Sequence, residues 1–320
     1  MPKFSVAPMM DWTDRHCRYF YRLMSKRAQL WTEMVTAKAI IHGDKNRLLD
    51  FDAREHPLVL QLGGSDPSEM AMAAKIGQDW GYDEININVG CPSDRVQSGS
   101  FGACLMQTPQ VVADCVAAMK QTLDIPVSVK SRIGVDDMQS YEQLTNFVEI
   151  VSASGCDNFI IHARKAWLKG LNPKENRTVP PLNYAWVYQL KRDFLQLTIG
   201  INGGVASISE ANEHLKQVDS VMLGRAAYHQ PYLLASVDPE IYQDHQDNNL
   251  IISREQILLE FIEYMKIQHT NCVPIRSMTR HILGLYHGQP NAKKFKRLLS
   301  GKVVEITHLY EWLDWERNHE

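Results

Sequence analysis

The chain has 320 residues, of which 44% are hydrophobic and 22% charged, values typical of a globular protein that exclude a mainly disordered or collagen-like chain. The net charge of −3 argues against a uniformly basic nucleic-acid binder, and no uncharged apolar run approaches the roughly 18 residues of a membrane span. The six cysteines are scattered without a Cys-x-x-Cys pair and the first residues lack the apolar core of a signal peptide, so we expect a cytoplasmic protein with neither a disulfide framework nor a metal site.

Eight short strand-like runs recur up to about residue 224, several of them almost continuously apolar, as strands covered on both faces tend to be. In chain order they are Phe4–Met9, Leu30–Thr36, Pro57–Leu62, Glu84–Asn88, Pro126–Lys130, Asn158–His162, Leu197–Asn202 and Ser220–Leu223. Amphipathic helical stretches separate most of them, one beginning at Thr108-Pro109 and another at a capping box of Ser207 and Glu210. This alternation predicts an α/β protein with a (β/α)8 TIM barrel over residues 1–235. A doubly wound open sheet is the alternative, but it favours an early glycine-rich loop, and the first turn here reads Ala-Pro-Met-Met-Asp.

The strand pattern stops after Arg225, and an acidic stretch and then a helical pattern replace it. Residues 236–249 carry Asp238, Glu240, Asp244 and Asp247 but no Lys or Arg, so we predict an acidic linker over residues 236–252. From Ser253 the apolar residues follow a helical period, and further helices are predicted over residues 274–286, 291–300 and 305–317. We therefore expect a small α-helical domain over residues 253–320.

The ends of the last two predicted strands carry residues suited to a phosphate. In this class of barrel the reacting groups lie at the C-terminal ends of the strands, and many members bind phosphate after strands seven and eight. Asn202, Gly203 and Gly204 follow the seventh strand, and Gly224 and Arg225 follow the eighth. Small residues let backbone N–H groups approach a phosphate, and an arginine adds a forked cation. Either segment alone is also compatible with a simple tight turn, but together they predict a phosphate site.

Gln61, Lys130 and His162 end the third, fifth and sixth predicted strands. A flat heterocycle with carbonyls and ring nitrogens needs such hydrogen-bonding groups around its rim, and a lysine would stabilise an anionic reduced flavin. The alternative for His162 is a hydrogen-bonded core histidine. Because Gln61 and Lys130 also place polar side chains at strand ends, we favour the ligand-binding interpretation for His162.

Cys91 follows the fourth predicted strand, between Gly90 and Pro92, on a loop that faces the same barrel mouth. A thiol at that place can act as a nucleophile or a general acid. The alternative is an inert buried cysteine, which we expect for Cys104, Cys115 and Cys156. No Cys/His/Asp pattern indicates a hydrolase triad.

Two basic regions remain. The loop over residues 162–177 holds Arg164, Lys165, Lys169, Lys174 and Arg177, with Trp167 between them, a combination that suits an RNA backbone and a splayed base. On the predicted helix that begins near Asn291, the basic residues Lys293, Lys294, Lys296 and Arg297 share one side, and Phe295, Leu298 and Leu299 share the other. A charged helix face is usually only solvated, but two such regions in one chain favour a polyanionic partner.

With these features in place, the chain resembles the tRNA-dihydrouridine synthase family, and most closely its A-type subfamily. The resemblance spans nearly the whole chain, and its most specific stretches are Phe4–Asp14, Ile85–Ser93, His162–Trp167 and Leu283–Gly288. It implies a barrel with tightly bound FMN, followed by a helical tRNA-binding domain. It also implies NADPH as a transient reductant, uridines 20 and 20a of the tRNA D-loop as targets, no membrane contact, and, we expect, a monomer.

The resemblance also implies roles for individual residues. The flavin would be contacted by Pro8, Met9 and Met10. Its ring and ribityl chain would be surrounded by Gln61, Lys130 and His162. Its phosphate would be held by Asn202, Gly203, Gly204, Gly224 and Arg225. Cys91 would donate a proton and Asn88 would touch the target uridine. Lys174, Arg177, Asn291 and Lys294 fall where the subfamily contacts tRNA, and the two basic regions add Arg164, Lys293 and Arg297 to this predicted surface.

Two other functions are compatible with parts of the sequence. A flavin-dependent barrel dehydrogenase or reductase acting on a free pyrimidine, such as dihydroorotate, would share the flavin site and the cysteine, but it leaves the helical domain and the basic regions unexplained. A catalytically silent RNA-binding module would have no flavin and no role for Cys91.

Overall fold

A computed structural model describes residues 2–93, 96, 99–243, 251–301 and 303–319 of the chain. Its strands are β1 (Phe4–Val6), β2 (Leu30–Trp31), β3 (Val35–Thr36), β4 (Leu58–Gly63), β5 (Glu84–Val89), β6 (Val127–Arg132), β7 (Asn158–His162), β8 (Thr198–Asn202) and β9 (Ser220–Leu223). They pair in parallel in the order β1-β9-β8-β7-β6-β5-β4-β2, and β3 pairs with the far end of β4. The Ser5–Gln29 bridge then brings β1 beside β2, so the sheet closes. The predicted (β/α)8 barrel is confirmed.

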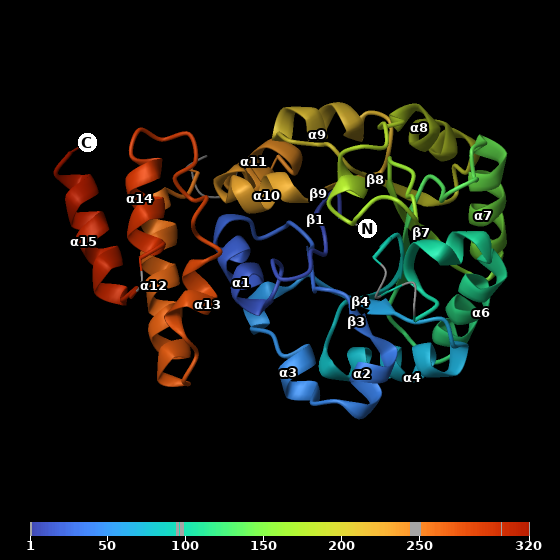
Figure 1. Cartoon of the computed structure of the whole chain (residues 1–320), viewed down its shortest axis with the longest axis horizontal. Helices are drawn as coiled ribbons and strands as arrows, with labels where there is room; N and C mark the ends of the chain where they lie inside the picture. Colours follow the sequence, from blue (N-terminus) through green and yellow to red (C-terminus); the bar gives the residue numbers. More distant parts are fainter. Residues whose placement is uncertain (1, 94–95, 97–98, 244–250, 302, 320) are drawn as a thin grey trace.

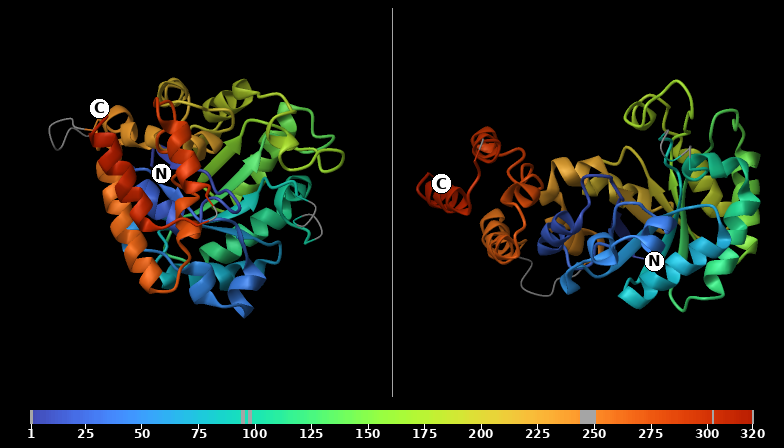
Figure 2. Two further views of the ribbon diagram at one scale, coloured as in Figure 1. Left: turned by 60° about the vertical axis from the view of Figure 1, so that its left-hand side comes forward. Right: turned by 60° about the horizontal axis from the view of Figure 1, so that its bottom comes forward.

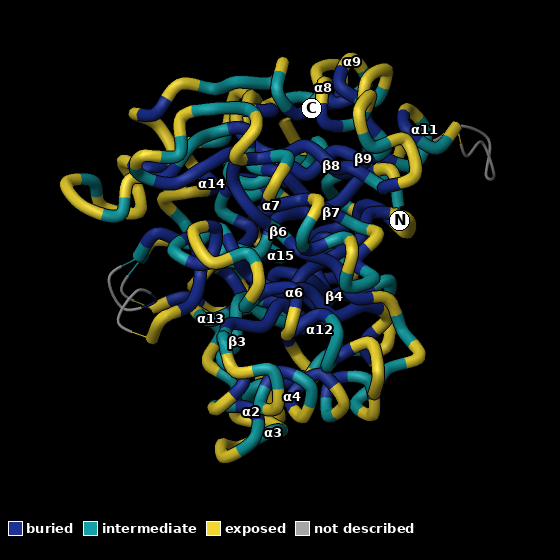
Figure 3. The backbone as a smooth tube through the Cα atoms, turned by 90° about the vertical axis from the view of Figure 1, so that its right-hand side faces the viewer, coloured by how far each residue is buried: buried dark blue, intermediate teal, exposed yellow. Residues whose placement is uncertain are grey.

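Helices surround this barrel, as Figure 1 shows. They are α1 (Arg15–Met24), α2 (Ala37–His42), α3 (Lys45–Leu49), α4 (Pro67–Trp80), α6 (Pro109–Lys120), α7 (Tyr141–Ala153), α8 (Tyr184–Asp193), α9 (Ile208–Leu215), α10 (Arg225–His229) and α11 (Val237–Ile241). Short 3-10 helices lie at η1 (Ala53–Glu55), η2 (Gly102–Gln107), η3 (Glu175–Arg177) and η4 (Pro231–Ser236). The predicted helix starts at Thr108 and Ser207 are confirmed, although the Thr108 side chain makes no capping bond. The tube in Figure 3 shows the strands buried and many of the connecting loops exposed.

The second predicted strand, Leu30–Thr36, is wrong as a single strand, because it divides into β2 and β3. Both pieces pair with β4, Leu30 with Leu58 and Val35 with Leu62. Between them the Thr32 hydroxyl accepts the N–H of Gln61 at 3.1 Å, in place of a backbone carbonyl. The ladder is therefore interrupted at Thr32. The first predicted strand is also shorter than expected, since β1 ends at Val6, whereas β6 continues two residues past its predicted end, to Arg132.

Apolar side chains fill part of the inside of the barrel. Ala7, Trp31, Val59, Ile160 and Met222 form a buried cluster of their own, separate from the larger core between the strands and the outer helices. The side chain of Met9 packs against this cluster. Because the interior is closed by packed side chains, a ligand can reach the strands only at the ends of the barrel.

The chain after α11 forms a group of helices on one side of the barrel (Figures 1 and 2). These helices are α12 (Arg254–Thr270), α13 (Ile275–Thr279), α14 (Ala292–Leu299) and α15 (Ile306–Arg317). The predicted helix 274–286 is wrong in its extent, since α13 ends at Thr279. Part of the predicted linker, residues 237–241, forms α11 with Val237 and Ile241 buried, and residues 244–250 lie outside the described residues. The division into domains at these boundaries stays a prediction.

Aromatic and polar contacts join these helices to α1. Tyr19 stacks on Tyr264 with ring centroids 3.8 Å apart, and the rings of Phe20 and Phe261, both fully buried, lie 5.2 Å apart. Full burial of such a side chain contributes about 1.5–3 kcal/mol, so this seam holds the C-terminal helices firmly. No helix in the described ranges is both long and apolar enough to cross a lipid bilayer.

Candidate active site at the barrel mouth

Polar side chains from neighbouring strands meet at the C-terminal end of the barrel. The strand register pairs Asn88 on β5 with Lys130 on β6, and it pairs His162 on β7 with both Arg132 and Asn202. The structure thus brings together the strand-end residues that the sequence predicted, and it adds Arg132. Lys130 lies inside β6 rather than at its end, which places its ammonium group deeper than expected.

A ladder of hydrogen bonds crosses the barrel interior and ends at this mouth. Gln61 Nε2 donates to Asn86 Oδ1 at 2.9 Å, and Asn88 Nδ2 donates to Gln61 Oε1 at 2.8 Å. Below them Asn86 Nδ2 donates to Ser128 Oγ at 2.9 Å, and the Ser128 hydroxyl donates to Glu84. Every one of these side chains is buried, so the ladder satisfies groups that would each cost about 1–3 kcal/mol if left unpaired.

Sequence reasoning missed the lower part of this ladder. The alternation of Glu84, Asn86 and Asn88 with apolar residues along β5 is the pattern that could have revealed it. In a strand with both faces covered, a polar residue at every second position marks the face that looks into the barrel.

The Cys91 loop is fixed by Asn88. The Asn88 Oδ1 atom accepts the N–H groups of Gly90 at 3.1 Å and of Cys91 at 3.0 Å, so the side chain shapes the turn that follows β5. The Cys91 carbonyl accepts the N–H of Ala103 at 2.9 Å, which ties the loop to η2. Cys91 itself is only half-buried. It is therefore held in place and open to a reactant.

The other cysteines differ from Cys91 in exposure or setting. Cys115 and Cys156 are buried, and burial raises the pKa of each thiol to about 12, as expected for inert residues. The prediction that Cys104 is buried is wrong, because it is half-buried, with its thiol donating to the Phe101 carbonyl at 3.2 Å.

Lys130 and His162 form the floor of the mouth. Lys130 Nζ donates to Asn202 Oδ1 at 3.1 Å, and burial, together with the charge of Arg132, lowers the pKa of this ammonium group to about 7. Burial and the neighbouring cations Arg132 and Lys130 hold the pKa of His162 well below its usual range. His162 is therefore neutral at physiological pH and offers one donor and one acceptor nitrogen.

Gly203 and Gly204 follow Asn202 with φ values of +109° and +79°, a conformation that favours glycine. A Cβ at Gly203 would lie 2.6 Å from the His162 ring, and one at Gly204 would lie 2.6 Å from the Tyr184 hydroxyl. The loop backbone therefore lies against the imidazole and the Tyr184 hydroxyl so closely that it admits no side chain of its own.

The Gly224–Arg225 turn lies beside the loop that contains Pro8, Met9 and Met10. The Ala7 N–H donates to the Leu223 carbonyl at 2.7 Å, and a Cβ at Gly224 would meet only Ala7 and Met9 at ordinary distances. Pro8 and Met9 are half-buried and Met10 is 57% exposed. These residues form the part of the rim that follows β1 and β9.

Positive charge accumulates at this mouth without a matching acid. Five basic residues lie close enough to affect one another or His162 electrostatically: Lys130, Arg132, Arg164, Arg177 and Arg225. Within the described chain none of the five forms an ion pair with a carboxylate. Such uncompensated charge suits an anionic ligand. Together with the glycine loop and the neutral imidazole, this donor set fits a heterocycle that carries a phosphate.

The residues predicted to bind RNA fall on two separate surfaces. In the loop after β7, Lys174 and Arg177 are exposed, and Arg164 donates to the Pro180 carbonyl while its Nε atom is buried without a partner. On α14, Lys293 and Arg297 are exposed over the buried Phe295 and Leu299, as the sequence pattern predicted. Asn291 precedes this helix and is exposed, and Lys294 Nζ lies 3.2 Å from the centroid of the Trp315 ring.

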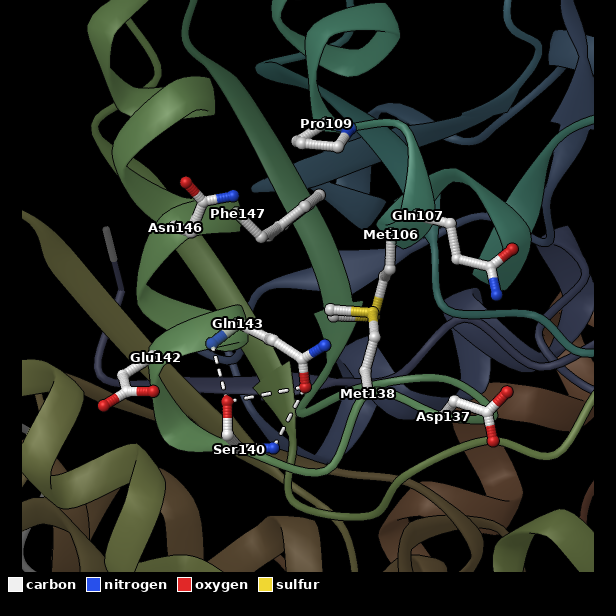
Figure 4. A pocket seen from close by; sticks show the side chains of 10 residues that line it. All are labelled: Met106, Gln107, Pro109, Asp137, Met138, Ser140, Glu142, Gln143, Asn146 and Phe147. Carbon is white, nitrogen blue, oxygen red and sulfur yellow. Dashed lines mark hydrogen bonds between the residues drawn. The ribbon is translucent and has the colours of Figure 1, made fainter.

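A pocket of about 490 Å³ lies elsewhere, between the start of α6 and the start of α7 (Figure 4). Met106, Met138 and Phe147 give it an apolar wall, and Gln143 bonds within it to Ser140. None of the predicted site residues lines it, so this pocket and the polar barrel mouth are different places.

Comparisons with known proteins agree on one family. The family model described as dihydrouridine synthase matches residues 5–310. A relative from Vibrio vulnificus is 58% identical over 299 residues, covering 93% of this chain and 90% of its own, and one from Synechocystis sp. is 57% identical over 300 residues, covering 94% and 89%. A third, from Shewanella oneidensis, is 54% identical over 312 residues, covering 96% and 92%. Each of the three is named tRNA-dihydrouridine(20/20a) synthase.

A solved structure shares the fold at much lower sequence similarity. The complex of 2-naphthoyl-CoA reductase with 2-naphthoyl-CoA aligns with a TM-score of 0.57 at 10% identity, covering 73% of this chain and 49% of that one. This likeness concerns the fold alone.

Proposed function

Because this chain belongs to the dihydrouridine synthase family, we propose that it reduces the C5–C6 double bond of uridines 20 and 20a in the tRNA D-loop to give 5,6-dihydrouridine. The observation that carries this proposal is the half-buried Cys91, held by Asn88 at a barrel mouth rich in uncompensated positive charge. A reductase for a nucleobase within RNA needs a proton donor at the base and cations for the phosphates around it.

FMN would be the cofactor bound at this mouth. Its phosphate would be held by Asn202, Gly203, Gly204, Gly224 and Arg225. Its ring and ribityl chain would be surrounded by Gln61, Lys130 and His162. Pro8, Met9 and Met10 would lie along the edge of the ring. When bound, FMN would supply the two-electron hydride chemistry needed to reduce uracil at C6, with NADPH as the source of the electrons. The support lies in the glycines that admit no side chain beside His162 and in the five cations that lack an acid.

Cys91 would complete the reduction by protonating C5 of the uracil ring. Loss of that proton leaves a thiolate, and the charges of Lys130 and Arg132 already act on the Cys91 position. A positioned general acid of this kind contributes roughly 10²- to 10⁴-fold to the rate. Asn88 would contact the uridine through the side chain that also shapes the Cys91 turn.

The two basic surfaces would bind the tRNA. A uridine inside a folded loop has to leave its stack before its C5–C6 edge reaches the barrel mouth, which costs a few kcal/mol. Phosphate contacts from Arg164, Lys174 and Arg177 on one side, and from Asn291, Lys293, Lys294 and Arg297 on the other, would offset that cost. We propose a cytoplasmic monomer that meets NADPH only transiently.

The test compares Cys91→Ala with Cys104→Ala, a matched control because both cysteines are half-buried and Cys104 lies on η2, to which the Cys91 loop is bonded. We expect Cys91→Ala to keep its yellow colour and its affinity for tRNA, yet to form dihydrouridine roughly 10²- to 10⁴-fold more slowly. The Cys104→Ala protein should turn over normally. Normal dihydrouridine formation by Cys91→Ala would contradict the assigned role. Reduction of free uracil in preference to tRNA would favour a reductase of free pyrimidines.

A further inference from the structure

Arg132, at the last position of β6, is 4% exposed and faces backbone carbonyls instead of an acid. Its Nε atom donates to the Gly90 carbonyl at 2.9 Å, and its Nη1 atom donates to the carbonyls of Lys165 at 3.0 Å and Asn176 at 2.9 Å. A single guanidinium thus joins the residue before Cys91 to the basic loop that follows β7.

Each of the two segments that Arg132 joins also contains one amide side chain that bonds to its backbone. Asn88 holds the Gly90–Cys91 turn from the β5 side. In the basic loop the fully buried Asn176 accepts the N–H of Trp167 at 2.8 Å and donates to the carbonyls of Trp167 and Leu171. Backbone bonds of Ala166 with Gly134 and Asp136 also tie the basic loop to the chain that follows β6. Arg132 adds a side chain that bonds to both segments at once.

Burying an arginine without a carboxylate partner lowers the stability of the fold, because the charged group loses its hydration. Burial lowers the pKa of Arg132 to about 10, which means that the protein surroundings oppose its charge. A planar fork, however, can reach several carbonyls at fixed angles, which a lysine ammonium or a neutral amide cannot do. Such an arrangement is expected where the exact position of the two loops matters more than the stability of the fold.

We propose that Arg132 is a positioning residue that sets the distance between Cys91 and the RNA-binding loop, so that a uridine delivered by that loop arrives at the thiol. This inference rests on the proposed function, because it assumes that Cys91 meets a base held by the basic loop. Displacements of about 1 Å at a reacting group are enough to slow a reaction about 10²-fold.

The chain supplies a matched control in Arg22. This arginine is also buried, its pKa is also lowered to about 10 by burial, and it donates to the carbonyls of Ser25, Ala28 and Glu55. Those carbonyls lie before β2 and β4, at the opposite end of the barrel from Cys91. Arg22 therefore has the same chemistry as Arg132 without access to the mouth.

The experiment compares Arg132→Lys, Arg132→Met and Arg22→Lys in the flavin-loaded protein. Stopped-flow absorbance separates reduction of the flavin by NADPH from its reoxidation by tRNA. For both Arg132 variants we expect reoxidation by tRNA to slow about 10²-fold. Reduction by NADPH should change less, and least in Arg132→Lys, which keeps the positive charge beside Lys130 and His162. Hydrogen exchange should rise at the Ala103 amide, which bonds to the Cys91 carbonyl, and at the Trp167 amide. Arg22→Lys should change neither of these readouts.

Several outcomes would overturn the proposal. A normal tRNA step in Arg132→Lys would show that a charge suffices and that the fork has no special role. Equal slowing in Arg22→Lys would reduce the effect to general stability. Unchanged exchange at the Ala103 and Trp167 amides would also refute it. If the unmutated protein fails to reduce tRNA, the proposed function falls, whereas the exchange measurement still decides whether Arg132 joins the two loops.

Should the Arg132 variants fail to fold, Asn176→Leu tests the same idea from the other side. It loosens the basic loop but leaves the Arg132–Gly90 bond in place. We expect kcat with tRNA to fall, because the loop that delivers the uridine is no longer held at a fixed distance from Cys91, while hydrogen exchange at the Ala103 amide stays unchanged. A normal kcat in folded Asn176→Leu would contradict the proposal.

Discussion

Lys130 and Arg132 stand two residues apart on β6, and neither of these buried basic groups forms an ion pair with a carboxylate in the described chain. The neighbouring strands add Asn202 and the neutral imidazole of His162. At the scale of single residues, burial and mutual repulsion of basic groups therefore make the mouth electrostatically unfavourable. Buried charge without a partner lowers stability, and strain of this kind is typical of functional sites.

The strain at Lys130 leads to a prediction about pH. The unfolded chain keeps this proton up to about pH 10.5, whereas the folded protein, with the pKa lowered to about 7, binds it only below that value. The loss of folding stability caused by burying the Lys130 charge is thus fully present below pH 7 and disappears as the pH rises toward 10.5. Lys130→Met should stabilise the flavin-free protein by on the order of 2–4 kcal/mol below pH 7, after loss of the Asn202 bond, and progressively less at higher pH.

Thermal unfolding of the flavin-free proteins between pH 6 and pH 10 measures this effect. Lys75→Met, at an exposed lysine paired with Asp79, is the control and should differ little from the parent at any pH. An advantage for Lys130→Met that grows with pH would contradict the explanation.

The identity of most mouth residues could be predicted from the sequence, because a barrel places its strand ends together whatever the loops do. Gln61, Lys130, His162 and Asn202 needed no more than that rule. Arg132 was missed because its partners are backbone carbonyls from loops distant in sequence, and no residue pattern encodes them. The depth of Lys130 was missed for a related reason, since β6 runs two residues further than its apolar run.

At the scale of elements, α14 is the clearest case in which periodicity predicts structure. Phe295 and Leu299 are buried and the cations between them are exposed, so the helix has one packed face and one free face. Helix 274–286 was predicted from the same kind of pattern and ended early. Its residue Gly284 approaches the His229 backbone so closely that a Cβ would lie 2.5 Å from the carbonyl oxygen. A contact with the barrel decides this conformation, and local sequence does not report such contacts.

The free face of α14 gives a prediction about tRNA affinity. Reversing the charge at Lys293, Lys294 and Arg297 should weaken tRNA binding, because three phosphate contacts are lost. The slope of log affinity against log salt should become shallower by about 2–3. Filter binding over a range of KCl concentrations measures both quantities, and reduction of the flavin by NADPH should stay intact.

The control for this variant reverses Lys26, Lys120 and Lys216, exposed cations near the C-terminal ends of α1, α6 and α9. These helix ends lead into strands, so they lie at the end of the barrel away from Cys91. The same change in net charge there should leave tRNA binding nearly unaltered. Equal losses in the two triple variants would remove α14 from tRNA recognition and point to net charge alone.

At the scale of the whole molecule, Asp14 joins the barrel to the C-terminal helices. Its carboxylate caps α1 by accepting the N–H groups of His16 and Cys17, and it also bonds to Arg280 at 2.7 Å and His281 at 3.1 Å. Burial by itself raises the pKa of Asp14, but the interactions with His281, the Cys17 N–H and Arg280 outweigh it and hold the pKa well below its usual range. One residue thus serves both the start of a helix and the contact between two parts of the chain.

Asp14→Asn separates these two roles, because asparagine caps helices about as well as aspartate but carries no charge. We expect a loss of about 1–3 kcal/mol at pH 7, since hydrogen bonds to charged groups are removed, and a raised KM for tRNA as the helices reorient. A depressed carboxyl pKa stabilises the fold above its ordinary value and ceases to do so in acid. The difference between the variant and the parent should therefore shrink below about pH 4.

Unfolding midpoints at pH 7 and pH 3 measure this difference. Asp66→Asn, at the exposed cap of α4 and away from the C-terminal helices, is the matched control. It should cost little stability at either pH and leave the KM for tRNA unchanged. An equal effect of the two substitutions would mean that the cap, rather than the contact with Arg280 and His281, accounts for the loss.

The pairing of β1 with β9 has a consequence for how the chain is made. Phe4 finds its partner in Val221, so the strand that leaves the ribosome first waits for one of the last strands of the barrel. At roughly 5–20 residues per second, that wait lasts tens of seconds. Throughout this time the nascent barrel is an open ribbon with two unsatisfied edges, which are prone to pair with other chains. Completion of the ring is therefore a late event in biosynthesis, and a ribosome that stalls before Ser220 leaves a product that cannot close.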